Sequence, residues 1–156
     1  MGSAFCQSVR RDFPVASLNH IGIAVSDIDS MKRLFALLGF GITHSEPVPE
    51  QGVVTHFLPV SRSGDLPCFE FLEVTDPAGA VAQFLKKRGP GIHHLSFSFQ
   101  KGELDDLTQR LRDAGYRLIY SEAKPGAHSM RINFIHPASA GGLLIEIMEP
   151  ASEPVK

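Results

Sequence analysis

The chain has 156 residues, the length of one ordinary domain, and its 43% hydrophobic and 21% charged content is typical of a folded globular protein. A net charge of -2 at pH 7 provides no basic surface, so we expect no nucleic-acid partner. No run approaches the roughly 18–20 apolar residues of a membrane span, and the N-terminus lacks the apolar stretch of a signal peptide. These features predict a protein with no membrane partner.

The two cysteines are Cys6 and Cys68. Cys6 lies in residues 1–16, which we expect to form a flexible arm, and residues 151–156 are expected to form a C-terminal tail. A disulfide is therefore not expected, and a reducing cytoplasm is the simpler interpretation of the cysteine content.

The predicted elements follow one another in a regular order. Alternation of apolar and polar residues predicts strands, helical spacing predicts helices, and Gly followed by an aromatic residue marks two helix ends. In chain order we expect a strand at 18–25, a helix at 28–38, strands at 40–46, 52–59 and 69–74, a linker helix at 78–87, a strand at 92–99, a helix at 103–114, and strands at 116–121, 130–135 and 143–148.

This order is one unit repeated twice. His20 and His94 occupy the third position of equivalent strands, 94 − 20 = 74 residues apart. Glu70 and Glu146 occupy equivalent places in Phe-Glu-Phe-Leu-Glu and Ile-Glu-Ile-Met-Glu, 146 − 70 = 76 residues apart. The sequence therefore predicts a single α+β domain over 17–150, with one module at about 17–76, a linker helix at 77–88 and a second module at about 90–150.

Strand alternation predicts which way the histidines point. His20 shares its face with Gly22 and Ala24, and His94 shares its face with Ser96 and Ser98. Bulky residues occupy the reverse face of both strands. Small residues beside an imidazole indicate the lining of a cavity.

The glutamates need a positive partner. A lone histidine in an apolar strand is more often a hydrogen-bonded core residue, and a lone strand glutamate most often faces solvent. Two pairs at repeated positions favour another interpretation, because a carboxylate between apolar residues cannot be buried unpaired, and no Arg or Lys has a matching strand position. We therefore predict that His20, Glu70, His94 and Glu146 bind one divalent metal ion, either Co, Mn, Zn, Ni or Mg. His93 should point to the other face and have a structural role.

The sequence resembles the vicinal oxygen chelate superfamily, which includes glyoxalases and bleomycin resistance proteins, and within it the methylmalonyl-CoA epimerases. The similarity covers about residues 17–150. The matching stretches are Leu18-Asn-His-Ile-Gly-Ile-Ala-Val25, Pro49-Glu-Gln-Gly-Val-Val54, Glu70-Phe-Leu-Glu73, Gly91-Ile-His-His-Leu95, Arg131-Ile-Asn-Phe-Ile-His-Pro137 and Leu144-Ile-Glu146.

The resemblance implies paired βαβββ modules that form a half-barrel around a divalent metal, and a homodimer. It places the metal on the same four residues and the acid–base role on Glu146. The implied activity is metal-dependent epimerisation of methylmalonyl-CoA or a similar acyl-CoA, through an enolate that the metal stabilises. Candidate substrate contacts, chosen from their positions in the chain, are Gln51, Thr55, Arg131 and Ser139.

Two positions depart from the family pattern. Some epimerases carry a second acid where this chain has Thr55, and a lysine common after His-Pro is Ala138 here. The first departure bears on the two-base mechanism, and the second on recognition of a CoA phosphate. The second proton donor is then a water held by Thr55 or Gln51, or a carboxyl such as Glu50 or Glu73.

Three alternatives remain open at the level of sequence. A lactoylglutathione lyase of the same superfamily uses a nearly identical two-His, two-carboxylate site. An extradiol dioxygenase binds iron through two His and one carboxylate, and both the fourth ligand and the short chain count against it. A non-catalytic antibiotic-binding module would use an aromatic cavity without metal, and the absence of Trp counts against it.

Overall fold

The computed structural model describes residues 15–61 and 66–151. Cys6, most of the expected N-terminal arm and all but the first residue of the expected C-terminal tail lie outside these ranges. The elements are β1 (Ser17–Val25), α1 (Ile28–Leu37), β2 (His44–Val48), η1 (Pro49–Gln51), β3 (Val53–Pro59), β4 (Cys68–Val74), α2 (Ala80–Arg88), β5 (Gly91–Ser98), α3 (Leu104–Asp113), β6 (Lys124–Pro125), η2 (Ala127–Ser129), β7 (Met130–Ile135), η3 (Pro137–Ser139) and β8 (Ile145–Pro150).

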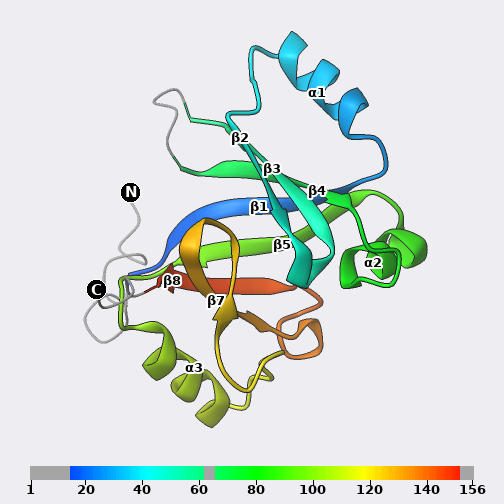
Figure 1. The fold of residues 1–156 in the computed structure, drawn as a ribbon. Coiled ribbons are helices and arrows are strands. Elements are labelled where there is room, and N and C mark those ends of the chain that lie inside the picture. The colour runs from blue at the N-terminus through cyan, green and yellow to red at the C-terminus, as the bar shows by residue number, and fades with distance from the viewer. Residues whose placement is uncertain (1–14, 62–65, 152–156) are drawn as a thin grey trace, which may run out of the picture.

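The strands of the described ranges form one curled sheet in the order β2-β3-β4-β1-β5-β8-β7-β6 (Figure 1). Strand β1 pairs with β4 in parallel, and β5 pairs with β8 in the same way, so each half of the chain has the same internal topology. The two halves join where β1 and β5 pair antiparallel at the centre of the sheet. This arrangement confirms the expected α+β half-barrel of two βαβββ modules.

Helices α1 and α3 lie on the outer side of the sheet, one for each half (Figure 1). Phe71 and Leu58 pack with Ile28 and neighbouring residues of α1, and Ile147 and Ile135 pack with Leu104 at the start of α3. Both helices end as the repeat predicts, because Gly39 and Gly115 follow them with a φ of +85°. The apolar faces of both modules are thereby buried against helices, and the concave face of the sheet stays available for a site.

The predicted strand at 116–121 is wrong. The chain there has one isolated bridge, between Leu118 and Ile135, and the paired strand is only Lys124–Pro125. Two backbone hydrogen bonds, from Ile119 N to Phe134 O and from His136 N to Arg117 O, hold the first part of this segment against β7. Beyond them, side chains bind the backbone: the Asn133 side chain both accepts from Tyr120 N and donates to Tyr120 O, and the Arg112 guanidinium donates to the carbonyl oxygens of Tyr120 and Ser121. These side-chain bonds satisfy the backbone where the segment leaves β7, so no regular strand forms.

The other elements agree with prediction except at their ends. The predicted strand at 40–46 begins at His44, because Phe40 N still bonds to Phe35 O and closes the end of α1. Strand β8 lies two residues later than predicted, at Ile145–Pro150. None of the helices in the described ranges is long and apolar enough to cross a membrane.

A buried charge ties α3 to the sheet. Glu149 is only 1% exposed, and one of its carboxylate oxygens accepts hydrogen bonds from Gly102 N at 2.7 Å and Leu104 N at 3.0 Å. The other oxygen lies 2.6 Å from Nη1 of Arg131, whose Nη2 also binds Asp105 on α3. Glu149 thus serves the amide groups at the start of a helix, where a negative charge is favourable.

We predict that Arg131→Met destabilises the protein by about 1–3 kcal/mol, because the buried Glu149 carboxylate loses its charged partner. Urea unfolding measures this change in the free energy of unfolding. Arg88→Met, at the exposed end of α2, is the matched control and should change stability by less than about 0.5 kcal/mol. Equal stability of the two variants would contradict the assignment.

Candidate metal centre

Four side chains meet on the concave face of the four central strands. The register places Glu70, Gly22 and His94 side by side on β4, β1 and β5. A second row places His20, Ser96 and Glu146 side by side on β1, β5 and β8. Each row therefore consists of a histidine and a glutamate with a small residue between them, and the two rows are equivalent by exchange of the two modules.

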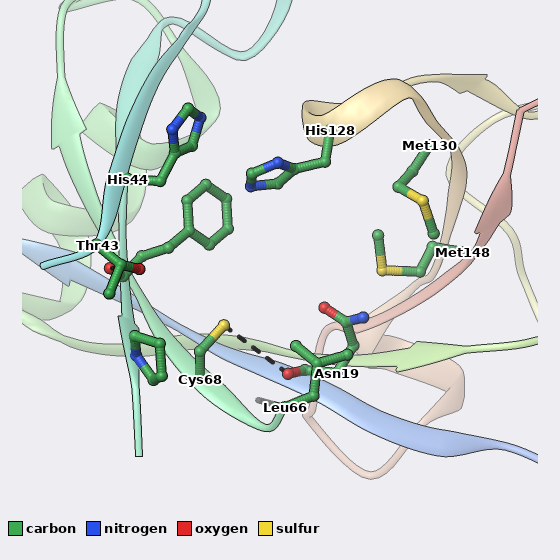
Figure 2. Close-up of a pocket in the computed structure, with 10 residues that line it drawn as sticks. Asn19, Thr43, His44, Leu66, Cys68, His128, Met130 and Met148 are labelled. Atoms are coloured by element: carbon green, nitrogen blue, oxygen red, sulfur yellow. Dashed lines mark hydrogen bonds between the residues drawn. The ribbon is translucent and has the colours of Figure 1, made fainter. Parts of the chain in front are cut away.

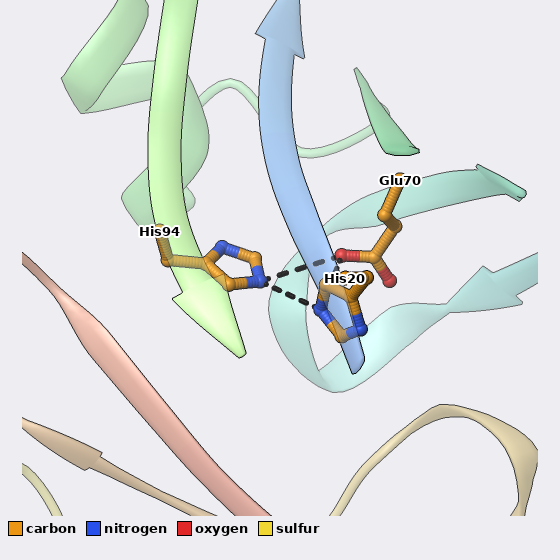
Figure 3. A group of neighbouring side chains, drawn as sticks. All are labelled: His20, Glu70 and His94. Carbon is orange, nitrogen blue, oxygen red and sulfur yellow. Dashed lines mark hydrogen bonds and ion pairs between the residues drawn. The ribbon is translucent and has the colours of Figure 1, made fainter. Parts of the chain in front are cut away.

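The polar atoms of the four residues converge, and Figure 3 shows three of them, His20, Glu70 and His94. The Nε2 atoms of His20 and His94 lie 3.0 Å apart. Oε2 of Glu70 lies 3.3 Å from Nε2 of His20 and 3.5 Å from Nε2 of His94, and Oε2 of Glu146 lies 3.2 Å and 3.9 Å from the same two atoms. His20, Glu70 and His94 form a buried group of possible ligands, with all three ligand atoms within 4.8 Å of one another. Glu146 adjoins this group at its edge.

Gly22 makes room for the ring of His94. A Cβ atom at Gly22 would come within 2.2 Å of Cε1 of His94, which no real side chain tolerates. The corresponding place in the second row has another small residue, Ser96, which is fully buried. The small residues that alternate with the histidines are thus required by the closeness of the imidazoles.

Each histidine is held by the residue that precedes it. Nδ1 of His20 lies 2.9 Å from Oδ1 of Asn19, and Nδ1 of His94 lies 3.0 Å from Nδ1 of His93. Burial, and then the neighbouring His94, lowers the pKa of His93 to about 4, so His93 is neutral and its Nδ1 can accept a hydrogen bond from Nδ1–H of His94. With both Nδ1–H groups directed outward, both Nε2 lone pairs point at the shared centre, as in protein metal sites. Sequence reasoning missed these contacts.

Burial and mutual contact shift the pKa values of His20 and Glu146. Desolvation disfavours a charge on His20, but contact with Glu146 and the charge of Glu70 outweigh it and raise the pKa of His20 above its usual value. Burial likewise opposes the charge of Glu146, but His20 and His94 outweigh it and hold the pKa of Glu146 below its usual value. An ionised carboxylate beside an imidazole with a raised pKa creates a local preference for positive charge, which a cation can satisfy.

The donor set fits a divalent metal ion. Within the described ranges, Oε2 of Glu146 is buried without a hydrogen-bond partner, although it lies close to His20. Nitrogen and oxygen ligands at about 2.0–2.2 Å from one ion are separated from each other by roughly 3–3.5 Å, close to the separations of these atoms. The chamber next to them has a volume of about 30 Å³, enough for an ion or a water molecule.

A much larger cavity of about 550 Å³ adjoins this chamber (Figure 2). Asn19, Phe57, His128 and Met148 line both spaces, so the two lie next to each other. The walls of the larger cavity are mostly apolar, and they include the thiol of Cys68. Burial and then the charge of Glu70 raise the pKa of that thiol to about 11, so it is no nucleophile at neutral pH.

The two edges of the half-barrel meet at the rim of these cavities. The backbone N–H of His128, on η2, donates to Oε2 of Glu46, on β2, at 3.1 Å. The His128 ring lies edge-on to Phe57 with 4.3 Å between ring centroids, and beside His44 at 4.9 Å (Figure 2). We call His44, Glu46 and His128 the rim group. The repeat could not reveal it, because its members have no equivalents in the two modules.

The residues predicted to contact substrate divide into two pairs. Gln51 and Thr55 line the chamber beside the ligands. Arg131 lies on the opposite face of the sheet, bound to Asp105 and Glu149, and the structure does not bring it to the centre. Ser139 lies outside both cavities, where its Oγ donates to His136 O and accepts from Arg117 N.

The candidate proton donors separate in the same way. Oε2 of Glu73 is bound to Nε2 of His56 at 2.9 Å, and neither residue lines the chamber. Glu50 borders neighbouring cavities but not the chamber itself. Thr55 lines the chamber, but its hydroxyl donates to the carbonyl oxygen of Glu46 at 3.1 Å.

A family model matches residues 19–134, and its description is the Glyoxalase/Bleomycin resistance protein/Dioxygenase superfamily. The match includes three of the four convergent residues and ends before Glu146.

Solved and curated relatives extend the similarity. Methylmalonyl-CoA epimerase from Mycobacterium tuberculosis is 40% identical, with a TM-score of 0.77 over 86% of this chain and 88% of that one. A variant of Streptomyces coelicolor methylmalonyl-CoA epimerase in complex with 2-nitronate-propionyl-CoA is 34% identical, with a TM-score of 0.76 over 86% of this chain and 97% of that one. The ethylmalonyl-CoA/methylmalonyl-CoA epimerase of Cereibacter sphaeroides is 30% identical over 85% of this chain and 97% of its own length.

We predict that Gly22→Ala weakens metal binding at least about 10-fold, because the new methyl group displaces the His94 ring. Isothermal titration with Co²⁺ measures the affinity. Gly41→Ala is the matched control, because a Cβ there meets nothing within 4 Å. Unchanged affinity in Gly22→Ala would show that His94 is not a ligand.

Metal affinity should fall as the pH falls, because a proton on His20 competes with the ion. The raised pKa of His20 means that this proton stabilises the metal-free protein at low pH and that its contribution is lost as the pH rises through the raised value. Titrations between about pH 6 and about pH 8, in buffers of different ionisation enthalpy, should show proton release on binding. A pH-independent affinity would exclude His20 from the ligand set.

Proposed function

The chain belongs to the Glyoxalase/Bleomycin resistance protein/Dioxygenase superfamily, and from this premise we propose that it is a metal-dependent epimerase of methylmalonyl-CoA. The observation that carries the proposal is the buried convergence of two imidazoles and two carboxylates beside a large apolar cavity. Several relatives that match most of its length are named as epimerases of this substrate.

One divalent ion, either Co, Mn, Zn, Ni or Mg, would be held by His20, Glu70, His94 and Glu146. Such an ion, when bound, polarises carbonyl oxygens and stabilises the negative charge of an enolate. The chain supports this chemistry by excluding water from the ligands, which are each at most 5% exposed. A dry site strengthens the electrostatic interactions on which an enolate depends.

Glu146 is the group proposed to take the α-proton. Its carboxylate is held ionised by His20 and His94, and one of its oxygens has no hydrogen-bond partner within the described ranges. An ionised carboxylate at the edge of the centre is placed to accept a proton from carbon. Gln51 and Thr55, which line the same chamber, are proposed to contact the acyl group.

The larger cavity suits the remainder of an acyl-CoA. Its volume of about 550 Å³ and its apolar walls, with Met130 and Met148 on one side, would receive the flexible thioester arm (Figure 2). The small chamber would receive only the reacting head group. Two adjacent spaces of such different size favour a ligand with a small polar head and a long tail. A lactoylglutathione-lyase-like reaction or non-catalytic antibiotic binding are the alternatives.

A homodimer and a cytoplasmic location complete the proposal. Leu34, Leu37 and Leu38 on and just after α1 are 50%, 87% and 61% exposed, an apolar patch of the kind that a second copy covers. The free, buried thiol of Cys68 is compatible with a reducing compartment.

Removal of the metal with a chelator should abolish epimerisation, and added Co²⁺ should restore it, because the enolate then regains its positive partner. A coupled assay of methylmalonyl-CoA inversion measures both steps, with a hemithioacetal as the control substrate. Turnover of the hemithioacetal alone would support the lyase alternative. A purified protein that binds no metal would contradict the enzyme proposals and leave the binding module.

Glu146→Gln should lower deuterium incorporation at C2 of methylmalonyl-CoA by about 10²–10⁴-fold, because a neutral amide cannot accept the α-proton. Mass spectrometry in D₂O measures the incorporation. Metal content is measured in the same samples, so that loss of the ion is separated from loss of the base. Wild-type protein that incorporates no deuterium at high concentration would overturn the proposed function.

A further inference from the structure

Inversion at carbon requires a proton to leave from one face and another to arrive on the opposite face. Glu146 serves only one face, so an epimerase needs a second group that can hold a proton. The inference that follows rests on the proposed function and concerns this second group.

The chamber offers one such side chain. Among the described residues that line it, the titratable ones are His20, Glu70, Glu146 and His128. The first three belong to the metal centre. Thr55 does not titrate, and its hydroxyl is bound to the backbone of Glu46. His128 is thus the one acid–base side chain lining the described chamber that the metal centre does not use.

His128 also lies on the appropriate side. Glu146 is on β8, a strand of the floor of the half-barrel, whereas His128 is on η2, at the rim where η2 meets β2. A ligand between floor and rim therefore presents opposite faces to the two side chains. Figure 2 shows His128 extending into the space between the two modules.

The backbone at His128 is held in an unfavourable shape. His128 and Ser129 have φ values of +53° and +55°, which residues other than glycine rarely adopt. Such conformations persist where surrounding contacts impose them, and they cluster at functional sites. Here the contacts are the N–H bond to Glu46 and the packing of the ring against Phe57.

Glu46 lies beside the His128 ring. Its Oε2 atom lies 3.9 Å from Nδ1 of His128 and 3.7 Å from Nε2 of His44. The ring centroids of His44 and His128 are 4.9 Å apart. The half-exposed His128 also has access to solvent, with which it can exchange its proton.

We propose that His128 is the second acid–base group of the epimerase. In one direction Glu146 takes the α-proton as the C–H bond breaks, and the imidazolium of His128 donates a proton to the opposite face of the same carbon. The products are the inverted substrate, protonated Glu146 and neutral His128, and proton exchange with solvent restores both groups. The reverse direction exchanges their roles.

The test is His128→Asn, because asparagine tolerates a positive φ and carries no proton that it can transfer. Each epimer of methylmalonyl-CoA is incubated separately with the metal-loaded variant in D₂O. We expect inversion to fall at least about 100-fold. The epimer whose α-proton faces Glu146 should still exchange deuterium without inversion, while the other epimer should not exchange.

The difference between the two epimers distinguishes an acid–base role of His128 from a structural one, because a structural role would slow exchange of both epimers equally. His136→Asn is the matched control: His136 lies outside both cavities, and asparagine keeps its capping bond to Ala138 N. It should invert both epimers at the wild-type rate. Normal inversion by His128→Asn, or equal loss of exchange for both epimers, would overturn the inference.

A second variant removes any dependence on folding of the loop. His128→Gly relieves the positive φ and opens space beside the large cavity, so added imidazole at tens of millimolar should restore inversion. Failure of imidazole to restore inversion in a folded, metal-loaded His128→Gly protein would also contradict the assignment. If the wild-type protein exchanges no deuterium into either epimer, the proposed function itself fails; if wild type inverts and both His128 variants match it, only this inference fails.

Discussion

Two carboxylates and two imidazoles share one buried volume, and the rest of the structure is organised around the charge that this places inside the protein. Neither Glu70 nor Glu146 is more than 5% exposed. Isolated buried carboxylates would be destabilising by several kcal/mol, so these residues constrain everything near them to supply positive charge or donors. The outward bonds of His20 and His94, the absence of a Cβ at Gly22 and the curl of the sheet all serve this constraint.

The concave surface of the sheet has a floor and a rim with different properties. The floor is made of central strands whose partners on both sides fix each residue by register, and it carries the dry, charged centre. The rim is made of an edge strand and a short turn with a strained backbone, and its polar group is half-exposed. The floor thus provides rigid ligands, and the rim provides contact with solvent. This division suits a reaction that must bind an ion and also exchange protons with solvent.

Much of this could be predicted from the sequence because the chain repeats. Equivalent histidines and glutamates, together with strand alternation, predicted the floor. The segment at 116–121 could not be predicted, because Asn133 and Arg112 bind the backbone of Tyr120 from distant positions and no regular strand forms there. Arg131 was assigned to the substrate although it serves Glu149, since a strand pattern does not reveal what lies across the sheet. His128 could not be predicted for a related reason. Its role depends on the contact between η2 and β2, which are far apart in the chain.

The arrangement of the four ligands in two equivalent rows also indicates how such a metal site can arise. Glu70, Gly22 and His94 form one row, and Glu146, Ser96 and His20 form the other, so each row takes its histidine from one half of the chain and its glutamate from the other half. A half-length chain that paired with a copy of itself through its first strand would therefore present the same four ligands. Fusion of two such copies would preserve the floor while releasing each rim to diverge. The reduced β6 and the lone His128 are on the part of the fold that such divergence would change first.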